Sequence, residues 1–329
     1  MQYRKLGNTD IDVSVMALGC WPFAGGGFWG DQDDAQSIAT VQTALNSGIN
    51  FFDTAPAYEE GASERVLGRA LEGKRHQAII ATKVSDLTAD GLVASCETSL
   101  KNLRTDYVDL YQIHWPNHKI PIETSWRALE GLVRDGKVRA LGVSNFGLED
   151  MADLVDLKVG RVQTNQLPYS LLWRAIEYDV LTRCRDLGIG LICYSPLAQG
   201  LLTGRYATAD EVPEGLARTR LYSTTRPLVN HGESGCEEAV FHAITGIREV
   251  SEQIGAPMGS VALAWVRQQV GVTSFLVGAR TPEELEGNLP SLSLDLDAAT
   301  TANLERLTQP IKEAIGRNAD MWMAESRMR

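Results

Sequence analysis

The sequence predicts an α/β protein: a single (β/α)8 TIM barrel domain over residues 1–329, with an N-terminal hairpin and extra C-terminal helices. Eight short apolar runs alternate with segments of helical periodicity, the pattern of right-handed βαβ units around a parallel sheet. Eight such units in about 300 residues fit a closed barrel. An open doubly wound sheet is the alternative, but no linker or change of composition divides the chain.

The predicted elements follow in order along the chain. A turn signal, Gly7-Asn8-Thr9-Asp10, predicts a small hairpin over residues 3–13. Buried strands are predicted at 13–19, 50–54, 78–84, 108–114, 139–144, 161–166, 190–195 and 272–277. Helices are predicted at 35–46, 63–71, 92–103, 123–133, 148–157, 175–186, 238–254, 260–269, 283–288 and 298–307, with a long irregular segment at 204–235 and a polar tail.

Composition and charge exclude several classes of function. The hydrophobic fraction of 44% is enough for a large core, and the net charge of −11 argues against nucleic acid and anionic membranes as partners. Five scattered cysteines without a C-x-x-C pair predict reduced thiols and no metal site. The N-terminus lacks a signal-peptide pattern, and no apolar run reaches the ~20 residues of a membrane span. We therefore expect a cytoplasmic protein.

Polar or special residues end nearly every predicted strand. These are Asp53, Lys83, His114, Asn145, Gln166, the pair Tyr194-Ser195, and Gly278. Active sites of such barrels lie at the carboxyl ends of the strands. A strand has to end somewhere polar, but that explains one or two of these residues rather than the whole series. The series therefore predicts a functional site.

Asp53 and Tyr58 belong to the run 50–58, in which a strand end is followed by a short turn. With Lys83 and His114 they predict a site that handles a proton. A lysine beside a tyrosine favours the phenolate, so we expect a lowered Tyr58 pKa and a phenol able to donate and accept a proton in turn. The competing interpretation is a structural ion pair with a core histidine.

The glycine-rich run 25–30 formally matches G-x-G-x-x-G. The dinucleotide fingerprint needs a strand directly before it and a helix opening on its glycines. Here Trp21-Pro22-Phe23 precedes the run and an acidic cluster follows it, which would repel a pyrophosphate. We interpret the run as a flexible loop over the barrel mouth.

Taken together, these residues resemble the aldo-keto reductases over essentially the whole chain. The matching pieces are Asp53-Thr54-Ala55-x-x-Tyr58, Ala81-Thr82-Lys83, Asp109-Leu110-Tyr111-Gln112-Ile113-His114, Gly142-Val143-Ser144-Asn145-Phe146 and Tyr194-Ser195-Pro196-Leu197. The segment 195–206 resembles the bacterial and channel-β-subunit-like branch. The resemblance implies a barrel that binds NADP(H), possibly NAD(H), with Asp53, Tyr58, Lys83 and His114 as catalytic residues.

The resemblance also implies a cofactor site. Cys20, Trp21 and Asp53 would lie near the nicotinamide ring, Tyr194 would stack on it, and Ser144, Asn145 and Gln166 would hold its carboxamide. Ser195, Pro196, Leu197, Gly200, Leu201 and Arg205 would line the pyrophosphate, and Gly278, Arg280, Glu284 and Asn288 the adenosine end. The last segment departs from the family at Gly278, Glu284 and Gly287, which leaves Arg280 as the partner for a 2′-phosphate.

The predicted activity is hydride transfer between a nicotinamide and a small or sugar-like carbonyl compound, with no oligomeric state predicted. Trp21, Tyr58, His114 and Trp115 would line the substrate pocket, together with Phe28, Trp29 and parts of 204–235. A nucleotide-binding regulatory subunit of the channel-β type is the first alternative. A barrel isomerase or lyase that uses Lys83 for a Schiff base is the second, although Asp53 should keep that lysine protonated.

Overall fold

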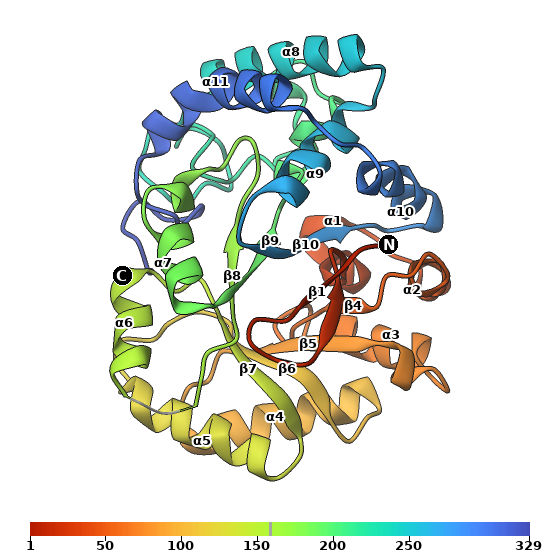
Figure 1. Cartoon of the computed structure of the whole chain (residues 1–329), viewed down its shortest axis with the longest axis vertical. Helices are drawn as coiled ribbons and strands as arrows, with labels where there is room; N and C mark the ends of the chain where they lie inside the picture. The colour runs from red at the N-terminus through yellow and green to blue at the C-terminus, as the bar shows by residue number, and fades with distance from the viewer. Residues whose placement is uncertain (158–159) are drawn as a thin grey trace.

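The computed structural model, which describes residues 1–157 and 160–329 apart from the side chain of Phe28, contains a closed parallel barrel (Figure 1). Its strand order is β10-β3-β4-β5-β6-β7-β8-β9, so chain neighbours pair around the ring. The strands are β3 (Met16–Gly19), β4 (Phe51–Asp53), β5 (Ile79–Val84), β6 (Val108–Ile113), β7 (Val138–Ser144), β8 (Thr164–Pro168), β9 (Gly190–Tyr194) and β10 (Val272–Gly278). The predicted (β/α)8 barrel is confirmed.

Helices surround the barrel. They are α1 (Gly26–Trp29), α2 (Asp34–Asn46), α3 (Ala62–Ala70), α4 (Ala89–Leu103), α5 (Ile122–Arg134), α6 (Leu148–Asp156), α7 (Val180–Leu187), α8 (Glu237–Ile254), α9 (Met258–Gln268), α10 (Pro282–Asn288) and α11 (Ala298–Ile315). Short 3-10 turns are η1 (Trp21–Ala24), η2 (Arg75–Gln77), η3 (Ala175–Glu177), η4 (Ala198–Thr203), η5 (Ala209–Glu211) and η6 (Leu289–Leu292). Side chains of Asp33, Thr88, Thr281 and Asp297 cap the helices that follow them.

The predicted hairpin is present as β1 (Tyr3–Lys5) and β2 (Asp12–Ser14), and it lies across the barrel in Figure 1. Leu6, Ile11 and Val13 share a buried cluster with inward residues of the barrel strands, such as Phe51 and Ile192. The hairpin therefore closes the end of the barrel at which the strands begin. The predicted strand 13–19 is divided, because its first residues pair within the hairpin and only Met16–Gly19 joins the barrel.

Several predicted boundaries were wrong. The predicted helix 175–186 is a 3-10 turn followed by α7, and the predicted strand 161–166 is shifted to Thr164–Pro168. The last helix continues past Pro310 to Ile315, since the stripe Leu304, Thr308, Ile311 and Ile315 remains buried. The run 25–30 contains the short helix α1 rather than a loop alone.

The polar tail beyond α11 is attached to the barrel rather than extended into solvent. Arg327 forms two hydrogen bonds with the fully buried carboxylate of Asp320, through Nε at 2.7 Å and Nη2 at 2.9 Å. Further on, the N–H of Arg329 donates to Asp150 at 2.8 Å, and its carbonyl accepts from the N–H of Glu149 at 2.8 Å. The tail thus crosses from α11 to α6, and Figure 1 marks the C-terminus beside α6.

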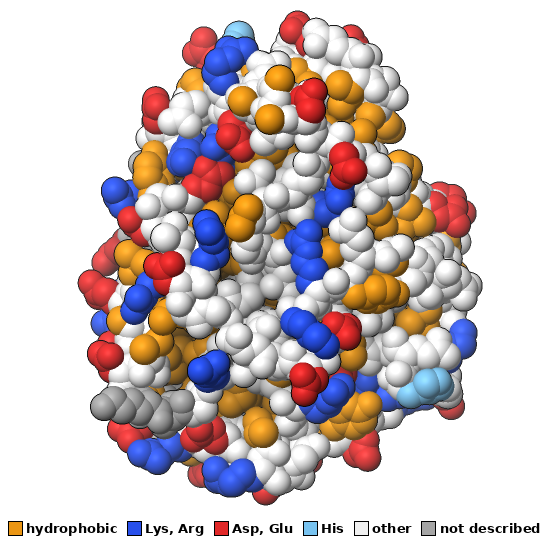
Figure 2. Space-filling model, viewed as in Figure 1, with side chains coloured by type: hydrophobic (Ala, Val, Ile, Leu, Met, Phe, Trp, Pro, Cys, Tyr) orange, Lys and Arg blue, Asp and Glu red, His pale blue; other side chains and the backbone are white. Residues whose placement is uncertain are grey.

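The surface carries charges of both signs. Figure 2 shows Lys and Arg side chains interspersed with Asp and Glu over the face that carries the hairpin. Within residues 1–157 and 160–329, none of the helices combines the length and the apolar character that a membrane crossing requires.

Asp109 forms a buried polar junction on the barrel wall. Its carboxylate is fully buried and accepts from Arg75 at 2.7 Å, from Arg139 at 2.5 Å and from the N–H of Ile80 at 2.9 Å. These three partners come from η2, β7 and β5, so one side chain joins three segments of the wall.

We expect Asp109→Asn to lower the free energy of unfolding by about 1–3 kcal/mol, because the amide loses the charge and one acceptor. Urea denaturation measures this directly. Arg139→Gln is the matched control, and since the Arg139 side chain is 48% exposed, its loss should cost less than about 1 kcal/mol. Equal losses in the two variants would contradict this account of the junction.

Candidate active site

Asp53 and Lys83 form a buried ion pair at the carboxyl ends of neighbouring strands. Asp53 ends β4, and Lys83 lies one residue before the end of β5. The distance from Lys83 Nζ to Asp53 Oδ1 is 2.6 Å, and Nζ also donates to the carbonyl of Thr54 at 2.9 Å. Asp53 is 2% exposed and Lys83 is fully buried. The pair therefore presents a fixed ammonium inside the barrel mouth.

Tyr58 reaches this ammonium from the loop between β4 and α3. Its N–H donates to the carbonyl of Ala55 at 3.1 Å, which closes a turn and brings the phenol back over the strand ends. Lys83 Nζ donates to the phenol oxygen at 3.2 Å and lies 5.1 Å from the ring centre. The structure thus brings together the aspartate, the lysine and the tyrosine that the sequence singled out.

These surroundings raise the pKa of Tyr58, whereas the sequence predicted a lowered pKa. Burial raises the pKa of the phenol, and the nearby Lys83 charge, which lowers it, offsets burial only in part, while Asp53 raises it further. The prediction of a lowered pKa was wrong because it counted the lysine and not the removal of water. The phenol is therefore protonated at neutral pH, which suits a proton donor.

Lys83 is held as an ammonium. Burial acts to lower its pKa, but Asp53 and Tyr58 together outweigh that effect, so the pKa lies above the ordinary value. A Schiff-base lysine has to lose its proton before it attacks a carbonyl. The geometry therefore disfavours the isomerase or lyase alternative.

His114 follows β6 directly, and its ring stands edge-on to Tyr58, with 6.1 Å between ring centres at 83°. The backbone of His114 is also held: its backbone N–H donates to the carbonyl of Val84 at 2.9 Å, and its backbone carbonyl accepts from the side-chain amide of Asn145 at 3.0 Å. Burial and the charges of Lys83 and Arg327 lower the pKa of His114 to about 3. The imidazole is therefore neutral near pH 7, a form that donates through one ring nitrogen.

A network of amides and hydroxyls occupies the next strand ends. Asn145, with a φ of +62°, donates to the Ser144 hydroxyl at 3.0 Å and accepts from the Tyr194 hydroxyl at 3.0 Å. Ser144 donates to the carbonyl of Gln166 at 2.9 Å. The residues that were predicted to hold a carboxamide, Ser144, Asn145 and Gln166, are thus joined by hydrogen bonds into one polar patch.

Two glutamines support Asp53. Gln166 donates to Asp53 Oδ2 at 2.8 Å, and Gln112 donates to the same oxygen at 3.4 Å. Gln112 was not predicted as a site residue, although a fully buried amide within the apolar strand β6 is the signal that could have found it. In the described part of the chain its side-chain oxygen has no hydrogen-bond partner.

The loop after β9 has the form of an anion cradle. Positive φ values occur at Ser195 (53°), Ala198 (47°), Gln199 (56°) and Gly200 (93°), and left-handed residues in a loop turn backbone N–H groups into a concavity. A Cβ on Gly200 would lie 3.8 Å from the Arg205 guanidinium carbon. With Arg205 this loop fits a pyrophosphate, and it contains the predicted residues Pro196 and Leu197 just before the turn η4 and Leu201 within it.

The predicted adenosine end is organised around Arg280. The backbone N–H of Arg280 donates to the carboxylate of Glu284 at 2.8 Å. The backbone carbonyl of Glu284 accepts from the side-chain amide of Asn288 at 2.9 Å. The guanidinium donates to the Gln32 side chain at 2.8 Å and to the carbonyl of Asp31. Arg280 therefore connects the segment after Gly278, at the end of β10, with the loop before α2, a contact that the sequence did not reveal.

Aromatic rings cover the phenol. Trp21 stacks on Tyr58 with 5.4 Å between ring centres and 18° between planes, and Trp29 stands edge-on to Trp21 at 5.5 Å. Cys20, just before Trp21, is fully buried and donates its N–H to the carbonyl of Asp53 at 2.8 Å. Phe28, which was also predicted to line this pocket, lies outside the described side chains.

Three further residues at the mouth were not predicted. Arg327 lies 3.5 Å from the ring centre of Trp115, and Arg218 lies 5.7 Å from Trp21 and 4.5 Å from Trp322. Arg327 and Trp322 belong to the segment after α11, which the sequence analysis described only as a polar tail. The tryptophan within that polar segment was the available signal, because an indole is rarely left in water.

A model of the aldo/keto reductase family matches residues 15–309. The chain belongs to this family. An aldo-keto reductase of Bacillus subtilis is 35% identical over 302 residues, covering 87% of each chain. An Escherichia coli protein named NADH-specific methylglyoxal reductase is 31% identical, covering 95% of this chain and 100% of its own.

Solved structures agree with the family assignment. The glycerol dehydrogenase of Gluconobacter oxydans superposes with a TM-score of 0.81 at 31% identity, covering 94% of this chain and 95% of its own. An aldo-keto reductase from Klebsiella pneumoniae, solved in complex with NADPH, gives a TM-score of 0.72 at 28% identity, covering 90% and 92%. The strand-end site therefore lies on a scaffold shared with family members.

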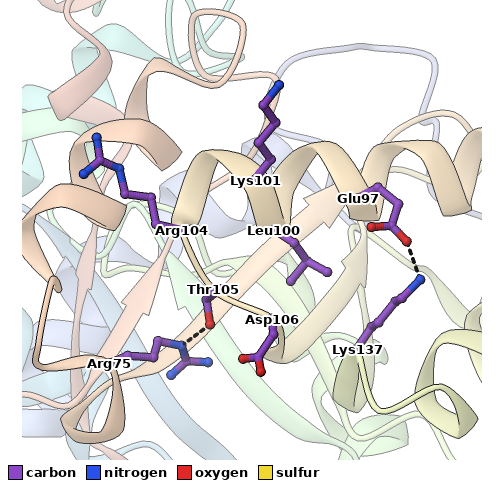
Figure 3. Close-up of a pocket in the computed structure, with 8 residues that line it drawn as sticks. All are labelled: Arg75, Glu97, Leu100, Lys101, Arg104, Thr105, Asp106 and Lys137. Carbon is purple, nitrogen blue, oxygen red and sulfur yellow. Dashed lines mark hydrogen bonds and ion pairs between the residues drawn. The ribbon is translucent and has the colours of Figure 1, made fainter.

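A groove at the opposite end of the barrel is separate from this site. Figure 3 shows Arg75, Thr105 and Asp106 beside helix α4, with Lys137 directed toward Glu97. Its residues adjoin the starts of β5, β6 and β7, whereas Asp53, Lys83 and His114 lie where strands end. The groove is open and holds ion pairs already made, so it is not the site of the family chemistry.

We expect His114 to make the protein less stable in acid. The unfolded chain binds the imidazole proton near its ordinary pKa of 6.5, while the folded chain resists it down to about pH 3. Between these values the unfolded state holds more protons, so the free energy of unfolding falls as the pH drops below about 6.5. Urea denaturation at about pH 5 and about pH 7.5 should show a smaller drop for His114→Gln than for the wild type. An equal drop would mean that His114 titrates normally when folded.

Proposed function

We propose that this chain is a nicotinamide-dependent oxidoreductase that interconverts aldehydes or ketones and alcohols, with Tyr58 as the general acid and base. The observation that carries the proposal is the position of the Tyr58 phenol, whose oxygen lies 3.2 Å from the buried Lys83 Nζ and whose ring stands edge-on to His114. The names of two relatives, a methylglyoxal reductase and a glycerol dehydrogenase, support a small carbonyl or sugar-like substrate.

Each of the four residues has a separate role in the transfer of one proton. Tyr58 donates its proton to the carbonyl oxygen during reduction, and Lys83 stabilises the phenolate that remains. Asp53 keeps the lysine in place, and a neutral His114 donates a hydrogen bond that orients the carbonyl. A bound nicotinamide supplies the hydride. In the oxidation direction the same phenolate takes the proton back.

The residues for the cofactor follow from the same geometry. Ser144, Asn145 and Gln166 would hold the carboxamide, and the loop from Ser195 to Arg205 would hold the pyrophosphate. NADP(H) is supported by the Klebsiella structure with NADPH, and NAD(H) by the relative named NADH-specific. Either cofactor fits this donor set, and Arg280 is the residue that would favour the 2′-phosphate.

The main test is Tyr58→Phe, which deletes the proton donor and keeps the ring. Turnover of methylglyoxal and other small aldehydes should fall by ~10²–10⁴, while nucleotide affinity, followed by tryptophan fluorescence, should barely change. Tyr178→Phe is the matched control, since that phenol donates to the backbone carbonyl of Lys312 in α11, away from the strand ends. Reduction by Tyr58→Phe at more than half the wild-type rate would exclude Tyr58 as the acid.

A second test concerns cofactor choice. Arg280→Ala should weaken NADPH binding by about ten- to a hundredfold, the effect of losing a charge-assisted contact, and should leave NADH binding almost unchanged. Arg205→Ala should weaken both, because the pyrophosphate is common to both cofactors. Fluorescence titration of each variant with each cofactor distinguishes these outcomes. If Arg280→Ala weakens NADH as strongly as NADPH, the arginine binds another part of the cofactor.

A further inference from the structure

Gln32, in the loop before α2, forms a reciprocal pair with Arg280, in the segment after β10. The guanidinium Nε of Arg280 donates to the side-chain oxygen of Gln32 at 2.8 Å, and the side-chain nitrogen of Gln32 donates to the backbone carbonyl of Arg280 at 3.0 Å. Arg280 Nη2 also donates to the backbone carbonyl of Asp31. Segments that are 248 positions apart in the sequence are therefore joined here, where helices α2 and α10 lie side by side (Figure 1).

The loop occupies one edge of the Arg280 guanidinium. An arginine donates through several N–H groups, and Nε and Nη2 form one edge of its planar fork. The acceptors on this edge are the amide oxygen of Gln32 and the backbone carbonyl of Asp31, so these contacts orient the guanidinium through neutral oxygens. In residues 1–157 and 160–329 no acceptor is hydrogen-bonded to Nη1, so this end of the fork keeps its donors for a phosphate.

Gln32 is itself fixed in place. Its side-chain nitrogen donates to the Ser37 hydroxyl at 2.9 Å, and Ser37 is fully buried in α2. Both ends of the amide are therefore engaged, the nitrogen by α2 and by the backbone of Arg280, and the oxygen by the guanidinium. The orientation of the guanidinium thus depends on a side chain that the folded barrel holds still.

Gln32 is the neutral member of an acidic run. Its neighbours on both sides are aspartates, and two of them have partners elsewhere: Asp33 caps α2, and Asp34 pairs with Arg69 at 2.5 Å. The side chain that meets the guanidinium of Arg280 is thus an amide. A carboxylate in its place would cancel the charge of the arginine and repel a phosphate.

We propose that Gln32 is a positioning residue for Arg280, which holds the guanidinium ready for the 2′-phosphate of NADP(H) and so favours that cofactor over NAD(H). This inference rests on the proposed function, in which Arg280 meets the 2′-phosphate, and adds the residue that makes Arg280 effective. An arginine side chain loses rotamer freedom when it binds an anion, and a guanidinium that is already fixed in the free protein loses less. The gain applies to the 2′-phosphate alone, because NAD(H) lacks this group.

The test measures the binding of nucleotide pairs that differ by the 2′-phosphate. Adenosine 2′,5′-bisphosphate and AMP form one pair, NADPH and NADH form the other, and calorimetric titration gives their dissociation constants without turnover. The readout is the factor by which the 2′-phosphate tightens binding within each pair. Gln32→Met should lower this factor by about two- to tenfold. The affinities for AMP and NADH should stay as in wild type, which also shows that the variant is folded.

Three further variants complete the design. Gln32→Glu keeps an acceptor for Nε but places a negative charge on the guanidinium, so the factor should fall below that of Gln32→Met. Gln36→Met makes the same change at an exposed glutamine of α2 and should leave the factor as in wild type. Added to Arg280→Ala, Gln32→Met should have no further effect on the factor, because the double variant has no guanidinium to position.

The outcomes separate this inference from the proposed function. If Arg280→Ala lowers the factor and Gln32→Met leaves it unchanged or raises it, Gln32 does not position the guanidinium, and the inference is overturned while the role of Arg280 stands. An equal fall for Gln32→Met with and without Arg280 would overturn it as well, because Gln32 would then act elsewhere. If Arg280→Ala leaves the factor unchanged, Arg280 does not bind the 2′-phosphate, and this inference fails with that assignment. Failure of the wild type to bind NADPH or NADH would overturn the proposed function itself.

Discussion

The ion pair between Lys83 and Asp53 is the interaction on which the site depends. Removing both charges from water is costly unless each group is fully satisfied. Lys83 has Thr54 and Tyr58 as further acceptors, and Asp53 has Gln166 and Gln112 as donors on its second oxygen. These partners come from the loop after β4 and from β6 and β8, which the closed barrel brings to one point. The barrel and the ion pair therefore support each other.

The same burial that makes the pair costly sets the chemistry of Tyr58. Water is excluded by Trp21, which stacks on the phenol, and exclusion of water favours the neutral form. The Lys83 charge lowers the pKa of Tyr58, so it reduces the free energy needed to form the phenolate. The effect is smaller than that of burial, so the phenol keeps its proton at neutral pH. These two opposed effects leave the Tyr58 phenol protonated at neutral pH, the state that its proposed role as a proton donor requires.

The features that were predicted correctly are those that leave a local pattern in the sequence. Alternating apolar runs revealed the barrel, and polar strand ends such as Lys83 and His114 revealed the site. What was missed depends on distant contacts. The direction of the Tyr58 pKa shift follows from the burial of the phenol in the folded barrel, which no local pattern reveals. The tail was described only as polar, and its polarity does not reveal that Asp320 is fully buried in contact with Arg327 and Arg220.

The barrel and the mouth of the site have different origins in the chain. The ends of β4, β5 and β6 supply Asp53, Lys83 and His114, the loop after β4 supplies Tyr58, and the ring of strands fixes their spacing. The segment 204–235 and the tail lie outside this repeat, yet they bring Arg218 and Trp322 to the mouth and are joined to each other through Arg220, which donates to the carbonyls of Asn318 and Asp320. Such segments can change without disturbing the ion pair, because they contribute none of its hydrogen bonds. Relatives of this chain carry names as different as methylglyoxal reductase and glycerol dehydrogenase, and segments of this kind are where the fold can vary while the strand-end ion pair stays in place.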